Sequence, residues 1–191
     1  MNNKRPASCT LGDLLDEIAT ATPSAEAVVF GDERLDYAGL KARVDGFARA
    51  LLAVGVRKGD RAAVLVTNRT GWIAAFAAAK IGAIVTRIST FSTPRELAWM
   101  LEHSGAVALV TIDSFRGRGF LGALRSLCPE LDGTVPGALS SARLPALRTV
   151  VALDGGPSAG VFSLPEFSRC RSFWPKGRRS MRRHSPPRNA P

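Results

Sequence analysis

Apolar residues in the first third of the chain recur at the spacing of amphipathic helices. The first set fits positions i, i+3, i+4 and i+7, and the proline after Thr22 is expected to end that helix. Its members are Leu11, Leu14, Leu15 and Ile18. A second set, with Asp36 as a favourable N-cap and Gly55 as terminator, predicts another helix. It contains Leu40, Val44, Phe47 and Leu51. Between the two helices, residues 27–30 and 34–35 predict the arms of a hairpin.

Further along, apolar runs alternate with helical patterns. Strands are expected at residues 62–66, 83–86, 106–110 and 149–151, and helices at residues 70–81, 93–104 and 120–128. Thr93, Pro94 and Glu96 form a capping-box start for one of these helices. The inward faces are expected to hold Trp72, Ile73, Phe76 and Ala77 in the first helix, and Leu97, Met100 and Leu101 in the next. This alternation predicts βαβ units and a partly parallel sheet, that is, an α/β fold.

The last part of the chain has a different composition. Residues 129–147 contain Pro, Gly and Ser with little periodicity and are expected to form a loop. From residue 168 onward, Arg, Ser and Pro replace the aliphatic residues, and such a segment buries too little apolar surface to offset its ordering entropy. We therefore expect a folded portion over residues 1–167 and a disordered basic tail over residues 168–191. A shifted reading frame in G+C-rich DNA is a second explanation for the composition of this tail.

The formal net charge of +10 comes mostly from the same tail. Residues 168–191 hold eight Lys or Arg and no acidic residue, whereas the rest of the chain has 18 basic and 16 acidic residues. A basic tail could bind nucleic acid or anionic lipid, with Phe173 and Trp174 adding stacking. The body of the protein is close to neutral, so its charge gives no strong evidence for a nucleic-acid-binding protein.

The overall composition is that of a globular protein. Of the 191 residues, 46% are hydrophobic and 22% are charged, which excludes a fully disordered chain, a collagen repeat and a coiled coil. No apolar run reaches the roughly 18 residues needed to span a bilayer, and the first residues lack the apolar core of a secretory signal. Three widely spaced cysteines, Cys9, Cys128 and Cys170, favour reduced thiols and a cytoplasmic location. With His103 and His184 as the only histidines, a multi-histidine metal site is excluded.

Two glycine-rich segments are similar to phosphate-binding loops in sequence only. Residues 117–122 match G-x-G-x-x-G, a dinucleotide-binding pattern. The preceding strand is expected to end near Thr111, which is too early for the tight strand-to-helix turn that this motif requires. We interpret the segment as a loop that enters a helix. Residues 155–160 lack the Lys and Ser/Thr of a P-loop, and Pro157 removes a backbone donor. A turn is the favoured interpretation there.

Other residues with catalytic potential have structural interpretations. His103 lies in the last turn of a predicted helix, where a cation interacts favourably with the helix dipole. A triad of His103 with Asp113 and a nearby serine stays open, although no G-x-S-x-G nucleophile elbow occurs in the sequence. Four aromatic residues lie in helical patterns and are expected to pack in the core or against another subdomain rather than to stack on bases. They are Trp72, Phe76, Trp99 and Phe120.

Taken in order, these segments make residues 11–167 resemble the N-terminal part of the adenylate-forming family, which includes AMP-dependent acyl-CoA synthetases, luciferases and peptide-synthetase adenylation domains. The matching segments are residues 22–23, 27–31, 35–40, 48–51, 55–61, 68, 72, 79–85, 94–97 and 103–106. No single segment is decisive, and their order and spacing carry the resemblance. The stretch from Ile88 to Leu97 is most similar to fatty-acyl or related carboxylate–CoA ligases.

The resemblance implies a two-step ligase. A carboxylate attacks the α-phosphate of Mg-ATP to give an acyl-adenylate and pyrophosphate, and the thiolate of coenzyme A then displaces AMP to form the thioester. This sequence contains no Ser/Thr/Gly-rich loop ending in Lys to hold the phosphates. No catalytic, cofactor-binding or metal-binding residue can therefore be assigned from the resemblance. It implies ATP, Mg²⁺ and CoA for the intact family and none for this chain alone.

Three functions stay open at this point. The leading hypothesis is an N-terminal fragment of an ATP-dependent carboxylate–CoA ligase, with a fatty acid as the expected substrate, that is inactive by itself. One alternative is a non-catalytic binding module whose basic tail binds nucleic acid or an anionic membrane. The other is a non-catalytic partner that completes a synthetase whose remaining part is a separate chain. The leading hypothesis also predicts an exposed apolar face that the rest of a ligase would cover.

Overall fold

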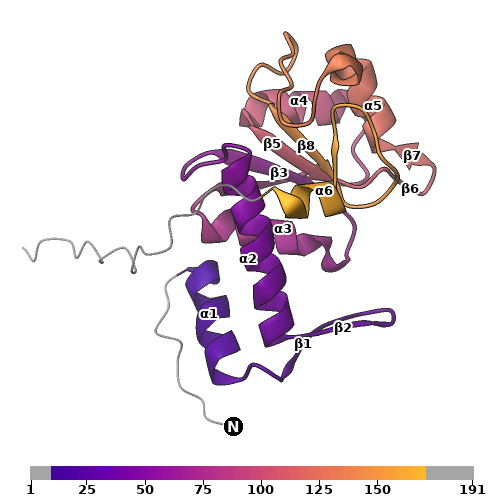
Figure 1. Cartoon of the computed structure of the whole chain (residues 1–191). Coiled ribbons are helices and arrows are strands. Elements are labelled where there is room, and N and C mark those ends of the chain that lie inside the picture. The colour runs from indigo at the N-terminus through magenta and orange to yellow at the C-terminus, as the bar shows by residue number, and fades with distance from the viewer. Residues whose placement is uncertain (1–9, 171–191) are drawn as a thin grey trace, which may run out of the picture.

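A parallel β-sheet forms the centre of the computed structural model, which describes residues 10–170 (Figure 1). Its five strands lie in the order β4-β3-β5-β8-β9, and all neighbours are parallel. The strands are β3 (Arg61–Leu65), β4 (Ile84–Arg87), β5 (Ala108–Thr111), β8 (Thr149–Ala152) and β9 (Phe162–Ser163). The predicted α/β class and the parallel sheet are therefore confirmed.

Helices cover both faces of this sheet. One layer contains α1 (Leu11–Ala21), α2 (Tyr37–Ala53), α3 (Ile73–Lys80) and α6 (Leu164–Arg169), and the other contains α4 (Pro94–Ser104) and α5 (Phe120–Leu127). Strand β5 shows how one apolar run serves both layers. Ala108 and Val110 pack in the core of the first layer, whereas Leu109 packs in the core of the second. Successive side chains of a strand point to opposite faces, so a continuous apolar strand must be covered twice.

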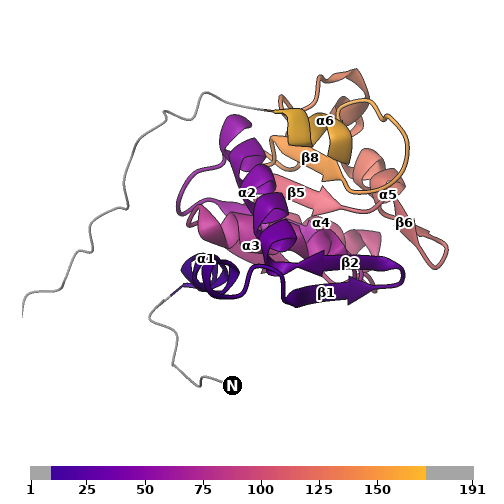
Figure 2. The ribbon, with the colours of Figure 1, turned by 60° about the horizontal axis from the view of Figure 1, so that its bottom comes forward.

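Two short hairpins extend from this three-layered body. Strands β1 (Glu26–Phe30) and β2 (Glu33–Asp36) pair antiparallel, and Figure 2 shows the pair projecting away from α1. Strands β6 (Ser114–Phe115) and β7 (Arg118–Gly119) form the second hairpin. Its two turn residues, Arg116 and Gly117, have φ of 50° and 78°. Positive φ at both central positions is the mark of a type I′ turn, whose twist matches that of the flanking strands.

Helix ends follow the local chemistry of the sequence. The Asp36 side chain accepts a hydrogen bond from the backbone N–H of Gly39 at the start of α2. Thr93 and Glu96 form the predicted capping box at the start of α4, and Gly105 ends that helix with φ of 61°. The same signature, Ser163 with Glu166, starts helix α6 and was not predicted from the sequence. These contacts satisfy backbone N–H groups that have no partner within the helix.

The predicted helix over residues 70–81 differs from the observed one in its ends and its buried face. Residues Thr70–Trp72 form a 3₁₀ turn, η1, before α3 begins. Alanines face the core here: Ala74, Ala77 and Ala78 are buried, whereas Trp72, Ile73 and Phe76 are only partly buried. Small side chains let α3 lie close to α2 and the sheet, and the larger ones are left at the margins of that contact.

The predicted loop over residues 129–147 starts with a 3₁₀ turn, η2 (Pro129–Gly133), and is anchored by buried leucines. They are Leu131, Leu139, Leu144 and Leu147. At the other predicted boundary, α6 extends to Arg169, so the first two residues of the predicted basic tail are helical. Cys170 caps α6, and the other residues of that tail, 171–191, lie outside the described residues, as do Cys9 and His184.

An ion network fastens α1 to the neighbouring helices. Lys80 of α3 lies 2.6 Å from both Asp16 of α1 and Asp45 of α2, and Lys41 of α2 contacts the same two carboxylates at 3.1 and 2.5 Å. Burial alone would raise the pKa of Asp45, but hydrogen bonds from Lys41 and Lys80 outweigh this effect and leave the pKa below its ordinary value. Gly12 permits the approach, because a Cβ there would lie 2.9 Å from the Cα of Lys80.

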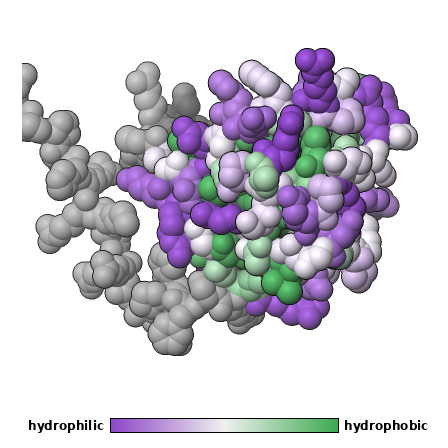
Figure 3. All heavy atoms as spheres, turned by 90° about the horizontal axis from the view of Figure 1, so that it is seen from above, coloured by the Kyte–Doolittle hydropathy of each residue, from purple (hydrophilic) through white to green (hydrophobic). Residues whose placement is uncertain are grey.

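The surface is mixed in character. Seen from above in Figure 3, hydrophobic side chains reach the surface in small groups between polar ones. None of the helices within residues 10–170 combines the length and the apolar character of a membrane-spanning segment.

We expect Gly160→Ala to destabilise the protein by about 2 kcal/mol or more. Gly160 has φ of 72°, and a Cβ there would lie 2.1 Å from the carbonyl oxygen of Leu131. The matched control is Gly122→Ala in helix α5, where a Cβ meets nothing within 4 Å. That change should stabilise the helix by about 0.5–1 kcal/mol. Denaturant unfolding of both variants measures the difference, and equal stabilities would contradict the structure of the β8–β9 connection.

We expect Asp45→Asn to lower the free energy of unfolding by about 1 kcal/mol at neutral pH. Because the folded pKa of Asp45 is depressed, its contribution is present above the unfolded pKa of about 3.9 and is lost as the pH falls through the lower folded value. The wild type and the variant should therefore converge in stability below about pH 4. Exposed Asp32→Asn is the control. A difference between wild type and Asp45→Asn that does not depend on pH would rule out the ion network as its cause.

Candidate functional site

The sheet contains a topological switch point at its centre. Strand β3 connects through α3 to β4 on one side, and the chain then returns through α4 to β5 on the other side of β3. Helices α3 and α4 lie on opposite faces of the sheet. Open α/β sheets bind their ligands in the crevice that such a reversal leaves beyond the carboxyl ends of the strands.

A cleft of about 720 Å³ opens at this edge, which is within the usual size range of small-molecule sites. We call it the carboxyl-edge cleft. Thr67 and Asn68 after β3, and Ser89 and Thr90 after β4, supply hydroxyl and amide groups. The other lining residues are Phe30, Val66, Arg69, Trp72, Arg87, Ile88, Phe91, Met100, Phe115 and Arg116. Polar and apolar side chains thus contribute about equally to this hollow.

The charge of this cleft is positive. Arg69, Arg87 and Arg116 line it, and none of its lining residues in the described part of the chain is acidic. Arg116 comes from the type I′ turn, and its guanidinium lies 5.3 Å from the centre of the Phe115 ring. Arginine in such a setting is suited to phosphate and carboxylate groups, to which it can donate two parallel hydrogen bonds.

One wall of the cleft is braced by a carboxylate. Asp154, two residues after β8, accepts hydrogen bonds from Arg69 at 2.7 Å and from the backbone N–H of Asp113 at 2.7 Å. It therefore joins segments that follow three neighbouring strands, β3, β5 and β8. The Nε atom of Arg69 is buried and has no hydrogen-bond partner among the described residues. A buried donor without an acceptor costs free energy. The Nε–H group of Arg69 therefore still needs a hydrogen-bond acceptor in the part of the chain that the structure describes.

The other wall is held by Arg118 of β7. Its guanidinium donates a hydrogen bond of 2.6 Å to the carbonyl oxygen of Phe91, in the loop between β4 and α4. The hairpin that carries Arg116 and the loop that carries Ser89 and Thr90 are thereby joined across the cleft mouth.

Both glycine-rich segments have the structural roles that we favoured. In residues 117–122, Gly117 lies in a hairpin turn, Gly119 in β7 and Gly122 inside α5, so the three glycines do not form one phosphate loop. Residues 155–160 connect β8 to β9, with positive φ at Gly155 and Gly160. Arg125 fixes this connection by donating hydrogen bonds to the Ser158 hydroxyl and the Ala159 carbonyl oxygen.

The open triad hypothesis finds no support in the geometry. His103 stacks on Trp99 at the carboxyl end of α4, with ring centres 4.8 Å apart. This helix end precedes the amino end of β5, whereas Asp113 follows the carboxyl end of β5. Phe120 is buried as predicted, whereas Trp99 is 61% exposed, which leaves packing against another subdomain as the prediction for Trp99. Burial raises the pKa of the Cys128 thiol, which makes it a poorer nucleophile at neutral pH.

Within residues 10–170, no cluster of three or more His, Cys, Asp or Glu side chains is placed to hold a metal ion.

Sequence reasoning did not identify the arginines of the carboxyl-edge cleft. Arg69 follows β3, Arg87 is the last residue of β4 and Arg116 lies in the hairpin turn after β5, and only the order of strands in the sheet brings them together. The available signal was the position of each arginine at or beyond the carboxyl end of a predicted strand, because the carboxyl ends of parallel strands meet at one edge.

Comparison with known proteins identifies the family. The model of the AMP-binding enzyme family matches residues 15–166. The medium-chain acyl-CoA ligase ACSF2 of Rattus norvegicus is 37% identical over 160 residues, which cover 82% of this chain and 26% of that ligase. The anthranilate CoA ligase AuaEII has a similar fold, with a TM-score of 0.72, 22% identity, and coverage of 87% of this chain and 29% of AuaEII. The o-succinylbenzoate CoA synthetase MenE of Bacillus subtilis is 34% identical, with a TM-score of 0.51 over 54% of this chain and 27% of MenE.

Each of these matches covers less than a third of a larger protein. The chain spans about a quarter of the length of the curated relatives that it matches. The expected relationship to adenylate-forming ligases is confirmed by the family match and by identities above 30% over most of the chain. The chain belongs to the AMP-binding enzyme family and corresponds to the N-terminal part of its acyl-CoA synthetase members.

Proposed function

We propose that residues 1–167 supply the N-terminal portion of the large domain of an ATP-dependent carboxylate–CoA ligase, with a fatty acid as substrate. The observation that carries this proposal is the carboxyl-edge cleft, where Arg69, Arg87 and Arg116 converge at the switch point of the sheet. The 37% identity to a medium-chain acyl-CoA ligase supports the substrate class. The cytoplasmic location expected from the widely spaced cysteines is part of the same proposal.

In this proposal the cleft binds a phosphate-bearing substrate of the ligase. Both ATP and CoA carry several phosphate oxygens, and Arg87 and Arg116 would hold such groups through charge-assisted hydrogen bonds. Asp154 keeps Arg69 in place and thereby fixes the wall of the cleft where β3, β5 and β8 end. Thr67, Asn68 and Ser89 offer neutral donors and acceptors that would orient the remainder of the substrate. Magnesium, when bound with ATP, would offset charge on the phosphates.

The chain alone is not expected to carry out the reaction. Adenylation needs preorganised donors around the phosphorus atom that is attacked, and these are usually supplied by a Ser/Thr/Gly-rich loop with a lysine. The sequence has no such loop, and the described residues contribute the carboxyl-edge cleft to the proposed substrate site. The alternative function through the basic tail depends on residues 171–191, which lie outside the described residues, and no feature within residues 10–170 favours it.

The proposed function is tested with a chimera in which residues 11–167 replace the matching part of the rat medium-chain ligase. We expect acyl-dependent ATP–pyrophosphate exchange by the chimera, because the substituted part retains the fold and the cleft. The chain of 191 residues by itself should give no exchange above background. Exchange by the isolated chain would contradict the proposed inactivity, and a folded chimera without activity would contradict the proposed function.

We expect Arg87→Ala and Arg116→Ala in the active chimera to raise the KM for ATP or for CoA about tenfold each, because each removes a charge-assisted hydrogen bond to phosphate. The matched control is Arg95→Ala, an exposed arginine on α4 that does not line the cleft. Steady-state kinetics with each substrate varied in turn identifies which of the two occupies the cleft. Unchanged KM values for both substrates in both variants would exclude the cleft as a phosphate site.

A further inference from the structure

Aromatic side chains line the carboxyl-edge cleft beside its three arginines. They are Phe30, Trp72, Phe91 and Phe115. Trp72 and Phe115 pack against the buried core of the α4–α5 layer, and the guanidinium of Arg116 also lies over the Phe115 ring. Phe30 and Phe91 belong to neither core cluster of the described residues and are 47% and 65% exposed. The rings of these two residues are therefore open to a ligand in the cleft.

Phe30 reaches the cleft from a segment that lies outside the central sheet. It is the last residue of β1, at the turn of the β1–β2 hairpin, and Figure 1 and Figure 2 both place this turn on the same side of the molecule as the β6–β7 hairpin. The preceding residue, Val29, is 48% exposed but does not line the cleft. Because successive side chains of a strand point to opposite faces, only the face that carries Phe30 is turned toward the cleft.

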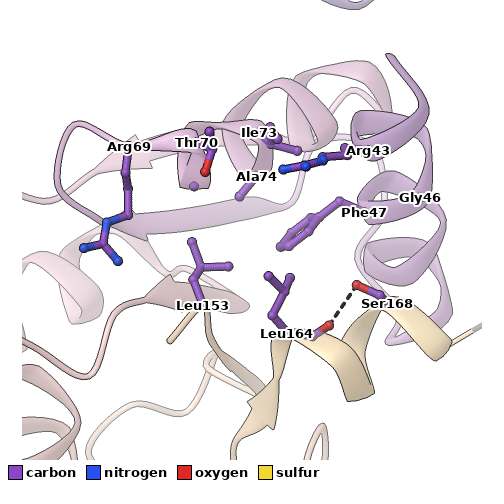
Figure 4. A pocket seen from close by; sticks show the side chains of 11 residues that line it. Arg43, Gly46, Phe47, Arg69, Thr70, Ile73, Ala74, Leu153, Leu164 and Ser168 are labelled. Carbon is purple, nitrogen blue, oxygen red and sulfur yellow. Dashed lines mark hydrogen bonds between the residues drawn. The ribbon is translucent and has the colours of Figure 1, made fainter. Parts of the chain in front are cut away.

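Glu33 ties this face of the hairpin to the body of the protein. It pairs with Phe30 across the hairpin, and residues directly opposite each other on antiparallel strands have their side chains on the same face. Its carboxylate accepts hydrogen bonds from Arg43 of α2 and from Thr70 of η1, which lower the pKa of Glu33. Figure 4 shows the Arg43 guanidinium extending from α2 toward Thr70. The hairpin is thus anchored through the same face that presents Phe30.

The side chains of the cleft match the separate parts of a nucleotide. Arg87 and Arg116 are suited to phosphate oxygens. An exposed aromatic ring is suited to a base, and such stacking strengthens binding by about tenfold. The volume of about 720 Å³ is in the usual range of small-molecule sites. A fatty acid has no planar base, and an inorganic polyphosphate has only charge, so neither would use both groups of side chains.

We propose that Phe30 stacks on the purine base of a nucleotide whose phosphates are held by Arg87 and Arg116, and that Glu33 is the positioning residue for Phe30. This inference rests on the proposed function and deepens it, because it adds a base-binding residue to the phosphate-binding arginines of the same cleft. ATP and CoA both contain adenine, so they form separate arms of the test.

The test titrates the full chain of 191 residues with ATP, with CoA and with inorganic tripolyphosphate, which carries phosphates but no base. Binding at the cleft is read by NMR from the amide signals of the cleft residues. Phe30→Ala should weaken the binding of ATP, of CoA or of both about tenfold and leave the affinity for tripolyphosphate unchanged. The matched control is Val29→Ala, which removes an equally exposed apolar side chain from the opposite face of the hairpin and should change none of the three affinities.

Two further substitutions separate stacking from an effect on folding. Phe30→Leu keeps an apolar side chain but removes the ring, and it should weaken nucleotide binding as Phe30→Ala does. Phe30→Tyr keeps the ring and should retain the affinity. The H2 and H8 protons of adenine should shift upfield on binding to the wild type, because they lie over the face of a ring, and this shift should be lost with Phe30→Leu.

The role of Glu33 is tested by exchanging its charge with that of Arg43. Glu33→Gln should weaken nucleotide binding about threefold, because an exposed ion pair that holds the hairpin is lost. The double variant Glu33→Arg with Arg43→Glu should restore the affinity. The affinity for tripolyphosphate should stay the same in both variants. Failure of the double variant to restore nucleotide binding would contradict the positioning role.

Three results would overturn the assignment of Phe30 and leave the proposed function in place. In the first, Phe30→Ala and Phe30→Leu bind ATP and CoA as tightly as the wild type, while Arg116→Ala weakens the binding of tripolyphosphate. In the second, Phe91→Ala alone causes the loss, which would assign the base to the loop between β4 and α4. In the third, Phe30→Ala weakens the binding of tripolyphosphate as much as that of the nucleotides. Absence of binding at the cleft by all three compounds would instead count against the proposed function, and the inference would fall with it.

Discussion

The need to cover both faces of a parallel sheet governs the whole molecule. Strands β3, β5 and β8 are buried almost completely, so helices are required above and below them. The two layers follow from the crossover connections, which place α3 on one face and α4 on the other. The same reversal leaves the carboxyl ends of the strands open, and it is there that polar and charged residues gather. The candidate site therefore results from the same crossover connections that cover the two faces of the sheet.

Local signals in the sequence were enough to predict most elements of the fold. The Asp36 cap, the Thr93–Glu96 capping box and the apolar run in β5 each depend on residues that are neighbours in sequence. Helix α6 was missed even though Ser163 and Glu166 carry the same capping signature, because the following segment is too short to show a helical period. Ala77 of α3 faces the core as predicted, but the burial of Ala74 and Ala78 was missed because periodicity ranks side chains by hydrophobicity, whereas close packing of helices selects for small size.

The candidate site was harder to predict, since its parts meet only through tertiary structure. Asp154 and Arg69 are 85 residues apart in sequence and form one ion pair at the edge of the sheet. Neither residue has a local pattern that marks its role. Strand order decides which of the loop residues become neighbours, and the sequence predicted a parallel sheet without that order. The family resemblance identified the scaffold correctly, but the arginines of the cleft lie outside the segments that carried the resemblance.

Arg116 owes its position to the handedness of the turn that holds it. Its own φ of 50° and the φ of 78° at Gly117 are values that L-amino acids resist and D-amino acids prefer. In a semisynthetic protein, D-alanine at position 117 would fit this backbone and reduce the freedom of the unfolded hairpin, with no side chain of the cleft altered. The position of the Arg116 guanidinium in the cleft therefore depends on the positive φ values of the turn as much as on the arginine side chain itself.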